Sequence, residues 1–359
     1  MKLKLLFLGA WIFIGQSMGS AWAQDSTQNK KIAESTERVF KAWLTDNGIK
    51  DGAMVVMRAG EVVGRAEQGD RKIDVPVTVA SLTKAITGAC VAQLIDAGKL
   101  QLTDKVADVL KAELSRLDKP KDARFNQVSI ADLLQNRSGY SPSADYTQGG
   151  VGHYLRGNSQ KQKNMLAQMD QVTRFDLAAD PGSTYHYANL NWLLLGIVIE
   201  RVTGEAYEDY CYKAILKPLN LPLSGLSPEW TMLSSYGGWH ISAQDYARFA
   251  AQLTKSVVDR KGPVNDWLLK LSAEAGAGRA FYALGTSIRI TPNGRTFWHS
   301  GSWLAKGSGA GGYFDSSFGS YFASFDNGVT YMVHYSKSMS GKTGDLDRLM
   351  GLAIRESLQ

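Results

Sequence analysis

The stretch VPVTVASLTKAITGACVAQLID, residues 75–96, contains the junction around which the rest of the sequence is organised. Residues 75–79 are mostly β-branched, which favours an extended segment. From 82 to 96 the apolar residues recur at helical spacing, and Gly98 follows as a favourable helix C-cap. The stretch therefore predicts an extended segment that meets a helix near Ser81.

Strands are expected on both sides of this junction, with helices between them. A helix at 30–46 precedes two short strands at 53–58 and 62–67, which residues 59–61 join as a tight hairpin. Residues from about 100 to 271 show helical patterns broken by Pro and Gly. Strand patterns return in the C-terminal part, at 282–291, 295–299, 311–315, 320–325 and 329–335, before a last helix at about 345–357.

This order of elements predicts an α+β fold, because the alternating βα units of a doubly wound parallel sheet are absent. We expect one antiparallel sheet flanked by helices, built from residues of about 30–80 and 280–359. An all-helical inserted region at about 100–271 separates the two parts of the sheet.

The composition is that of a globular protein and excludes several other classes. The 359 residues are 44% hydrophobic and 21% charged, with a formal net charge of +6. This composition excludes a disordered or collagen-like chain. No basic cluster is interleaved with aromatic residues, so we expect no nucleic-acid partner.

The first 23 residues have the pattern of a signal peptide. Lys2 and Lys4 form a positive start, residues 5–14 are apolar, and residues 21–23 read AWA, the small-x-small pattern that signal peptidase recognises. We expect cleavage after residue 23, a single domain at 24–359, and a periplasmic or extracellular location. The apolar run is too short for a membrane span, which needs about 20 residues, so no transmembrane anchor is expected in the mature form.

The two cysteines, Cys90 and Cys211, lie in segments with helical patterns. An exported protein can form disulfides, but two buried thiols fit the pattern equally well, so their state stays open. No cysteines or histidines have the spacing of metal ligands. We therefore expect neither a metal site nor an organic cofactor.

The first group with catalytic potential is Ser81 with Lys84, the only Ser-x-x-Lys in the sequence. Residues three apart on a helix are neighbours, so the lysine amine is expected beside the serine hydroxyl. A serine at a helix N-terminus also faces backbone N–H groups that favour a nucleophilic oxygen and a developing oxyanion. The simpler alternative is a helix-capping serine with a solvated lysine, but the position at the strand-to-helix junction argues against it.

The second group is Tyr187 with Asn189, the only Tyr-x-Asn in the sequence. It follows a turn at 180–182 and precedes an apolar helix, so it is expected on a loop that enters the core. A phenol can relay protons, and a carboxamide can both donate to and accept from an amide substrate. When this pair is taken alone, a packed tyrosine and a capping asparagine are the better explanation.

The third group is His299, Gly301 and Ser302, at the end of a predicted strand. A glycine lets a substrate lie close to the strand edge, and the N–H of Ser302 can serve as an oxyanion donor together with the N–H of Ser81. When this group is taken alone, a strand histidine with satisfied hydrogen bonds is the better explanation. The order of the three groups is more specific than any one of them. Their spacing places them on the sheet–insert junction, in the insert and back on the sheet, where they can converge on one cleft.

These motifs resemble the serine β-lactamase and penicillin-binding protein superfamily, especially class C β-lactamases, D-alanyl-D-alanine carboxypeptidases, D-aminopeptidases and related esterases. The similarity includes residues 79–84, 133–140, 181–204 and 237–249. The resemblance implies that Ser81 is the acylated nucleophile and that Lys84 and Tyr187 share the acid–base work. It also implies that Asn189, His299, Gly301 and Ser302 bind substrate. Whether the lysine or the tyrosine is the acylation base is disputed among related enzymes.

The sequence departs from the family pattern at two positions. Members that act on β-lactams often have Lys-Thr-Gly as the third motif, and here His299, a weaker cation at neutral pH, replaces that lysine. A literal Lys-Thr-Gly occurs at 342–344, but it follows the last predicted strand and opens the final helix. Arg137 stands where many relatives have an uncharged residue, and the sequence offers no account of it.

We therefore expect an exported serine hydrolase that acts through a covalent Ser81 acyl-enzyme. Its substrate would be a small molecule or peptide with an ester or amide bond, such as a D-amino-acid peptide, a β-lactam or a small ester. The substitution at His299 favours a peptidase or esterase over an efficient β-lactamase. The alternative is a non-catalytic penicillin-binding-like protein that recognises cell-wall peptides. Substrate choice is expected to depend on the loops at 148–163 and 236–240.

Overall fold

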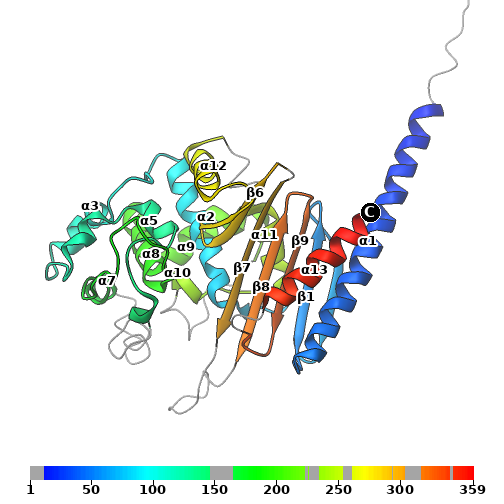
Figure 1. The fold of residues 1–359 in the computed structure, drawn as a ribbon, viewed down its shortest axis with the longest axis horizontal. Coiled ribbons are helices and arrows are strands. Elements are labelled where there is room, and N and C mark those ends of the chain that lie inside the picture. Colours follow the sequence, from blue (N-terminus) through cyan, green and yellow to red (C-terminus); the bar gives the residue numbers. More distant parts are fainter. Residues whose placement is uncertain are drawn as a thin grey trace, which may run out of the picture.

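The computed structural model describes residues 12–145, 165–222, 225, 234–253, 261–292, 294–303, 317–339 and 343–359 (Figure 1). The expected loop at 148–163, the expected strand at 311–315 and Lys342 lie outside these residues. Within them, no helix is both long and apolar enough to cross a membrane.

The central element is a seven-stranded antiparallel sheet in the order β2-β1-β9-β8-β7-β6-β5. The N-terminal hairpin lies beside the last strand, because Gly52 of β1 pairs with Tyr335 of β9. The predicted sheet, formed from the two ends of the chain, is confirmed. Its strands are β1 Gly52–Arg58, β2 Glu61–Gln68, β5 Ala280–Ala283, β6 Thr286–Thr291, β7 Gly294–Trp303, β8 Phe318–Phe325 and β9 Val329–Tyr335.

The strand expected at 282–291 is wrong as a single element, because the structure divides it into β5 and β6. The turn is made by Leu284 and Gly285, whose φ angles are 53° and 77°. Leucine rarely adopts a positive φ, so the apolar run gave no sign of a turn at this residue. The next strand, β7, is longer than the expected 295–299 and includes Gly301 and Ser302.

Helices cover both faces of the sheet. Helices α1 (Ile12–Asp46) and α13 (Thr343–Leu358) lie on one face, and the helical region lies on the other (Figure 1). Strand β1 is buried on both sides: Val56 lies in the core beneath α1 and α13, whereas Val55 and Met57 lie in the core around α2 (Thr83–Asp96). Two apolar layers therefore enclose the sheet.

Where the structure describes it, the inserted region is helical, as predicted, apart from the two-residue strand β4 (His240–Ile241), which pairs with β3 (Val77–Thr78). Helix α8 (Asn189–Thr203) contains the apolar run 190–199, which is fully buried. Among the described residues, the α-helices that follow α2 and precede β5 are α3 Val106–Val109, α4 Lys111–Leu114, α5 Ile130–Leu134, α7 Met165–Thr173, α8 Asn189–Thr203, α9 Tyr207–Cys211, α10 Ser234–Gly237, α11 Ala243–Leu253 and α12 Pro263–Ala275.

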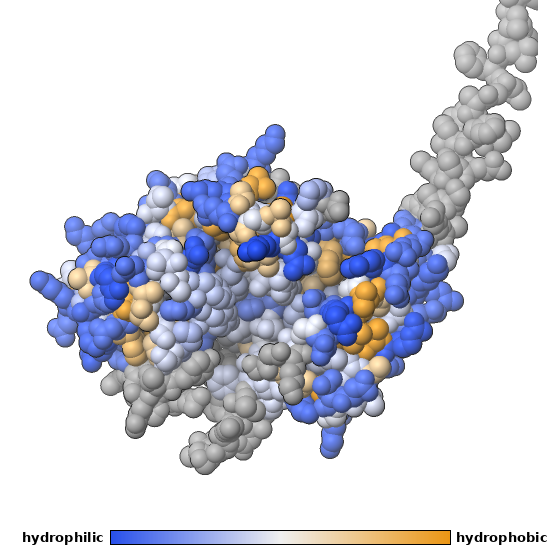
Figure 2. All heavy atoms as spheres, viewed as in Figure 1, coloured by the Kyte–Doolittle hydropathy of each residue, from blue (hydrophilic) through white to orange (hydrophobic). Residues whose placement is uncertain are grey.

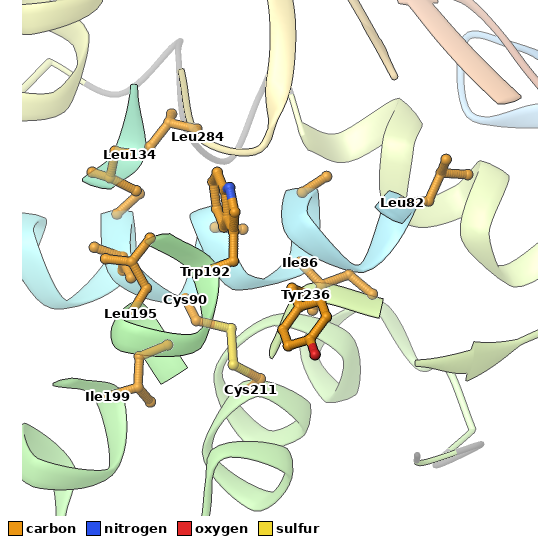
Figure 3. Packing of buried hydrophobic residues seen from close by; sticks show 14 of the residues in the cluster. Leu82, Ile86, Cys90, Leu134, Trp192, Leu195, Ile199, Cys211, Tyr236 and Leu284 are labelled. Atoms are coloured by element: carbon orange, nitrogen blue, oxygen red, sulfur yellow. A yellow bond between two sulfur atoms is a disulfide. The ribbon is translucent and has the colours of Figure 1, made fainter. Parts of the chain in front are cut away.

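A disulfide joins the insert to the helix at the junction. Cys90 of α2 is bonded to Cys211 of α9, with their Cα atoms 5.6 Å apart. The bridge is buried in the apolar core, among side chains such as Trp192 and Ile86 (Figure 3). The pairing that the sequence left open is therefore a bridge.

Candidate active site

Ser81 and Lys84 lie together at the start of α2. Ser81 belongs to a short 3₁₀ turn, Ala80–Leu82, that leads directly into the helix. The Lys84 side chain is fully buried, and its Nζ donates to Ser81 Oγ at 3.0 Å and to the Tyr236 carbonyl oxygen at 2.8 Å. The i,i+3 spacing thus places a buried amine against a serine hydroxyl, as the sequence predicted.

The segment before Ser81 is held in an unusual conformation. Ala80 has a φ of 48°, in the left-handed region that a residue with a side chain seldom adopts. The carbonyl oxygen of Val79 accepts a hydrogen bond from Ser320 Oγ at 2.8 Å, and the Val79 N–H donates to Trp239 O at 3.1 Å. Contacts to the sheet and to the insert therefore hold the strained residue next to Ser81, an arrangement common at functional sites.

Strand β7 runs directly beside the Ser81 backbone. A Cβ atom added at Gly301 would lie 2.4 Å from Val79 O and 3.2 Å from Ser81 N. Only glycine allows the strand to come this close. Ser302, the next residue, pairs with Gly319 of β8, and its hydroxyl is hydrogen-bonded to Ser338. Gly301 and Ser302 thus lie at the predicted place, and their roles with substrate remain predictions.

Tyr187 and Asn189 enter the same site from the insert. The Lys84 ammonium lies 5.1 Å from the centre of the Tyr187 ring, a cation–π geometry. The ring also packs edge-on against His299, at 5.9 Å between centres. Asn189 begins α8, and both side chains are half-buried. The structure therefore brings the three predicted groups together at one place.

Asn136 fixes the segment that carries Tyr187 and was missed by the sequence analysis. Its Oδ1 accepts from Asn191 Nδ2 at 3.0 Å and from Trp192 Nε1 at 3.2 Å, and its carbonyl oxygen accepts from the His186 N–H at 2.8 Å. Its φ is 55°, a conformation that asparagine tolerates better than most residues. That tolerance is the only local signal of its role.

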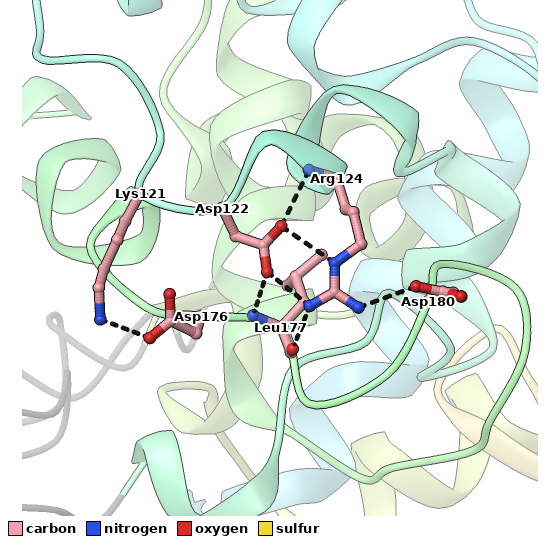
Figure 4. Close-up of polar contacts among 6 residues, drawn as sticks. All are labelled: Lys121, Asp122, Arg124, Asp176, Leu177 and Asp180. Atoms are coloured by element: carbon pink, nitrogen blue, oxygen red, sulfur yellow. Dashed lines mark hydrogen bonds and ion pairs between the residues drawn. The ribbon is translucent and has the colours of Figure 1, made fainter.

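A charged network anchors the turn that precedes Tyr187 (Figure 4). Asp122 accepts hydrogen bonds from Arg124 Nη2 at 2.7 Å and from the Leu177 N–H at 3.0 Å. Arg124 reaches across to Asp180 at 2.8 Å and to the Leu177 carbonyl oxygen at 2.6 Å. The hydrogen bonds from Arg124 hold the pKa of Asp122 well below its usual range. The turn at 180–182 is thereby tied to the loop before α5.

His299 is a neutral side chain in this site. It is only 8% exposed, and burial together with the nearby Lys84 lowers its pKa to about 3. The sequence suggested a weak cation, and the structure makes it uncharged at neutral pH. Its Nε2 lies 3.3 Å from Tyr282 Oη.

Tyr282, on β5, is a second residue that the sequence analysis missed. Its ring packs edge-on against Tyr187 at 6.0 Å and against His299 at 5.7 Å. Burial raises its pKa well above the ordinary value, so the phenol stays protonated. The sequence predicted a single strand at 282–291, without the β5–β6 turn, and so did not indicate which way the Tyr282 side chain points.

Among the described residues, no group of three or more His, Cys, Asp or Glu side chains can hold a metal ion. The chemistry that these residues can perform is nucleophilic. A serine next to a buried amine, with a tyrosine and a close-packed strand edge, is suited to acyl transfer.

The sequence matches the family described as Beta-lactamase over residues 36–347. It is 27% identical over 220 residues to the N-acetylmuramyl-L-alanine amidase of Bacillus subtilis strain 168, a match that covers 55% of this chain and 46% of the relative. The chain spans about half the length, or less, of such curated relatives.

The fold is similar to solved structures of this family. A D-stereospecific amidohydrolase from a Streptomyces species has a TM-score of 0.65 and 19% identity, with 88% of this chain and 97% of that chain covered. A class C β-lactamase has a TM-score of 0.64 and 16% identity, with 92% and 97% covered. The chain belongs to the Beta-lactamase family, a family of serine hydrolases.

Proposed function

We propose that this protein is an exported serine hydrolase that transfers the acyl group of an ester or amide first to Ser81 and then to water. The observation that carries the proposal is the contact between Ser81 Oγ and the buried Lys84 amine, at 3.0 Å, with the Tyr187 ring beside it. A binding module has no need for a buried amine beside a serine hydroxyl, whereas acyl transfer through that serine needs a base within hydrogen-bond reach.

In the first step, Ser81 Oγ bonds to the substrate carbonyl carbon while its proton passes to the Lys84–Tyr187 pair, which starts with one proton fewer than an ammonium beside a phenol and can therefore accept it. The carbonyl oxygen becomes an oxyanion, for which the N–H groups of Ser81 and Ser302 are the proposed donors. The carbon–heteroatom bond then breaks, and the leaving group takes the proton from the same pair. Which of the two side chains is the immediate base stays open.

In the second step, water replaces the leaving group. The Lys84–Tyr187 pair accepts a proton from water as its oxygen bonds to the acyl carbon, and the bond to Ser81 Oγ breaks with return of a proton to that oxygen. The products are the free acid and the original serine, so the reaction consumes only substrate and water.

The substrate class is proposed as a D-amino-acid peptide or a small ester in preference to a β-lactam. The neutral His299 supports this choice, because it offers no positive charge where β-lactam-active relatives often have a lysine. The similarity in fold to a D-stereospecific amidohydrolase is consistent with it.

Export is supported by the signal-like residues 1–23 and by the Cys90–Cys211 bridge, since disulfides persist in oxidising compartments. N-terminal sequencing of the protein from a periplasmic or culture fraction tests this part. A mature chain that begins at Gln24 is expected, and an intact Met1 in the cytoplasmic fraction would contradict it.

Turnover of para-nitrophenyl butyrate tests the activity itself. The wild type is expected to release nitrophenol continuously, whereas Ser81→Ala should not exceed the rate of buffer alone. Ser115→Ala, which changes an exposed serine after α4, is the matched control and should behave as wild type. Saturable binding of the ester without product release by the wild type would favour the non-catalytic alternative.

A further inference from the structure

A cavity of about 550 Å³ lies beside the candidate active site. It is bordered by α12, β5 and the residues that follow α5. Its wall includes Tyr282, whose ring contacts Tyr187 and His299. Tyr185, two residues before Tyr187, forms another part of the wall and packs on Tyr282 at 5.8 Å. Tyr282 therefore borders the cavity and also contacts the rings of Tyr187 and His299 in the candidate active site.

The size and surface of the cavity suit part of a small ligand. Its volume falls within the range of about 300–1,000 Å³ that is usual for ligand sites. Leu271, Phe281 and the two tyrosines give it an apolar wall, while Gln135 and Ser287 add polar groups. In Figure 2, strongly hydrophilic and hydrophobic spheres adjoin each other over the region of α12.

Two arginines, Arg137 and Arg279, also line this cavity. Within the described part of the chain, neither guanidinium has a hydrogen bond or ion pair, although Arg137 is half-buried. The backbone of Arg137 is fixed, because its N–H donates to Asp132 O at 2.7 Å and its carbonyl oxygen accepts from the Gly182 N–H at 2.8 Å. The backbone of Arg137 is thus bonded to the same turn that leads to Tyr187.

The one acidic residue in the wall does not neutralise these arginines. The Glu274 carboxylate is 3.8 Å from the Lys270 ammonium, one turn earlier on α12, and both side chains are exposed. The wall therefore carries a net positive charge. An arginine guanidinium binds carboxylates through paired, charge-assisted hydrogen bonds.

We propose that this cavity is a substrate subsite for a carboxylate carried on an apolar stem, with Arg137 and Arg279 as its cations. The inference rests on the proposed hydrolase function, whose reacting bond lies at Ser81. It explains Arg137, the departure from the family pattern that the sequence left without a role.

Matched substrates test the assignment. One pair is the para-nitrophenyl ester of glutarate against that of glutaramate, which replaces the acyl-side carboxylate by an amide. The other is the butyrate ester of 3-hydroxybenzoate against that of 3-hydroxybenzamide, which does the same on the leaving group. The wild type is expected to prefer the carboxylate member of at least one pair in kcat/KM.

Arg137→Gln and Arg279→Gln are each expected to lower that preference ratio about tenfold, as loss of a charge-assisted hydrogen bond implies. Arg116→Gln, which removes an exposed charge outside the cavity, is the control and should leave the ratio unchanged. Equal kcat/KM for both members of both pairs in the wild type, or a ratio that the two arginine variants do not alter, would overturn the assignment.

A binding measurement separates this inference from the proposed function. 4-Phenylbutyrate should raise the melting temperature of Ser81→Ala more than 4-phenylbutyramide does. In the double variant Ser81→Ala/Arg137→Gln, the two compounds should raise the melting temperature equally. Equal shifts with the two probes would contradict the subsite even if the esters are hydrolysed. If the wild type hydrolyses none of the esters while the carboxylate still stabilises Ser81→Ala, the proposed function fails and the subsite stands.

Discussion

Two buried histidines are predicted to destabilise the protein on mild acidification. His299 and His334 are 8% and 2% exposed, and burial lowers the pKa of each to about 3. Lys84 adds to the effect on His299, and Arg71 adds to that on His334. His334 Nε2 lies 3.3 Å from the Thr78 carbonyl oxygen, in the segment that leads to Ser81.

The direction of the pH effect on stability follows from how many protons the folded and unfolded states bind. A histidine in the unfolded chain has a pKa of about 6.5, so between pH 6.5 and 3 the unfolded state binds more protons than the folded state. Stability therefore rises with pH across this window and is lost as pH falls through it. When the pH falls from 7 to 5, each histidine lowers the free energy of unfolding by about 2 kcal/mol. This value is the product of about 1.36 kcal/mol per pH unit and the roughly 1.5 units between the unfolded-state pKa and pH 5.

Three carboxyl groups also have shifted pKa values, but they affect stability at lower pH or in the opposite direction. Hydrogen bonds from backbone N–H groups lower the pKa of Asp51 and Glu67, so their contributions are lost only below about pH 4. Burial raises the pKa of Glu200, which favours the folded state as pH falls. Substitution of each histidine isolates its own contribution from these effects.

Urea unfolding followed by tryptophan fluorescence at pH 7 and pH 5 measures the prediction. The free energy of unfolding of the wild type should fall when the pH is lowered from 7 to 5. In His299→Gln and in His334→Gln, that fall should be smaller by about 2 kcal/mol, because one of the two buried histidines is absent. The double variant should remove both losses. If the variants and the wild type lose the same amount, neither histidine is held neutral by the fold.

Further predictions concern the bridge, a glycine contact and the lysine. The double variant Cys90→Ala/Cys211→Ala should lower the free energy of unfolding by about 5 kcal/mol, because the bridge closes a loop with a sequence separation of 121; equal urea midpoints for this variant and the oxidised wild type would contradict it. In Gly88→Ala the new Cβ would lie 2.2 Å from a carbonyl oxygen of the β5–β6 turn, so unfolding should become easier by about 1–3 kcal/mol. Gly351→Ala, which meets nothing within 4 Å on α13, should instead stabilise by about 0.5–1 kcal/mol in the same urea assay, and similar midpoints for the two variants would argue against the close contact. Lys84→Met should reduce kcat on para-nitrophenyl butyrate by about 10²–10⁴-fold, as loss of general acid–base help implies, and an unchanged kcat would exclude the lysine from catalysis.

The sheet and the spacing of the motifs could be predicted because both depend on local patterns. The apolar and aromatic residues of β8 and β9 run over several positions, as expected of strands that are buried on both faces. Strands at both ends of the chain with helices between them leave few topologies. The Ser81–Lys84 contact needed only three residues of helix. Their convergence with Tyr187 followed from the order of motifs and from the family resemblance.

The residues that were missed depend on contacts between distant segments. Tyr282 contacts His299 across a sheet in which the chain turns at Leu284, a residue with a positive φ. Leucine is not a typical turn residue, so the sequence did not indicate this turn. The disulfide required knowledge of how α9 packs on α2 across a separation of 121 residues. Asn136 acts through hydrogen bonds to a segment more than 50 residues away.

Intact mass spectrometry after incubation with a fluorophosphonate tests the central claim most directly, because the probe leaves a stable phosphonyl group on an activated serine. The wild type is expected to gain one adduct that peptide mapping places on Ser81. Ser81→Ala should gain none, and Lys84→Met should react more slowly than the wild type. An unlabelled wild type, or the same adduct on Ser81→Ala, would show that Ser81 is not the nucleophile.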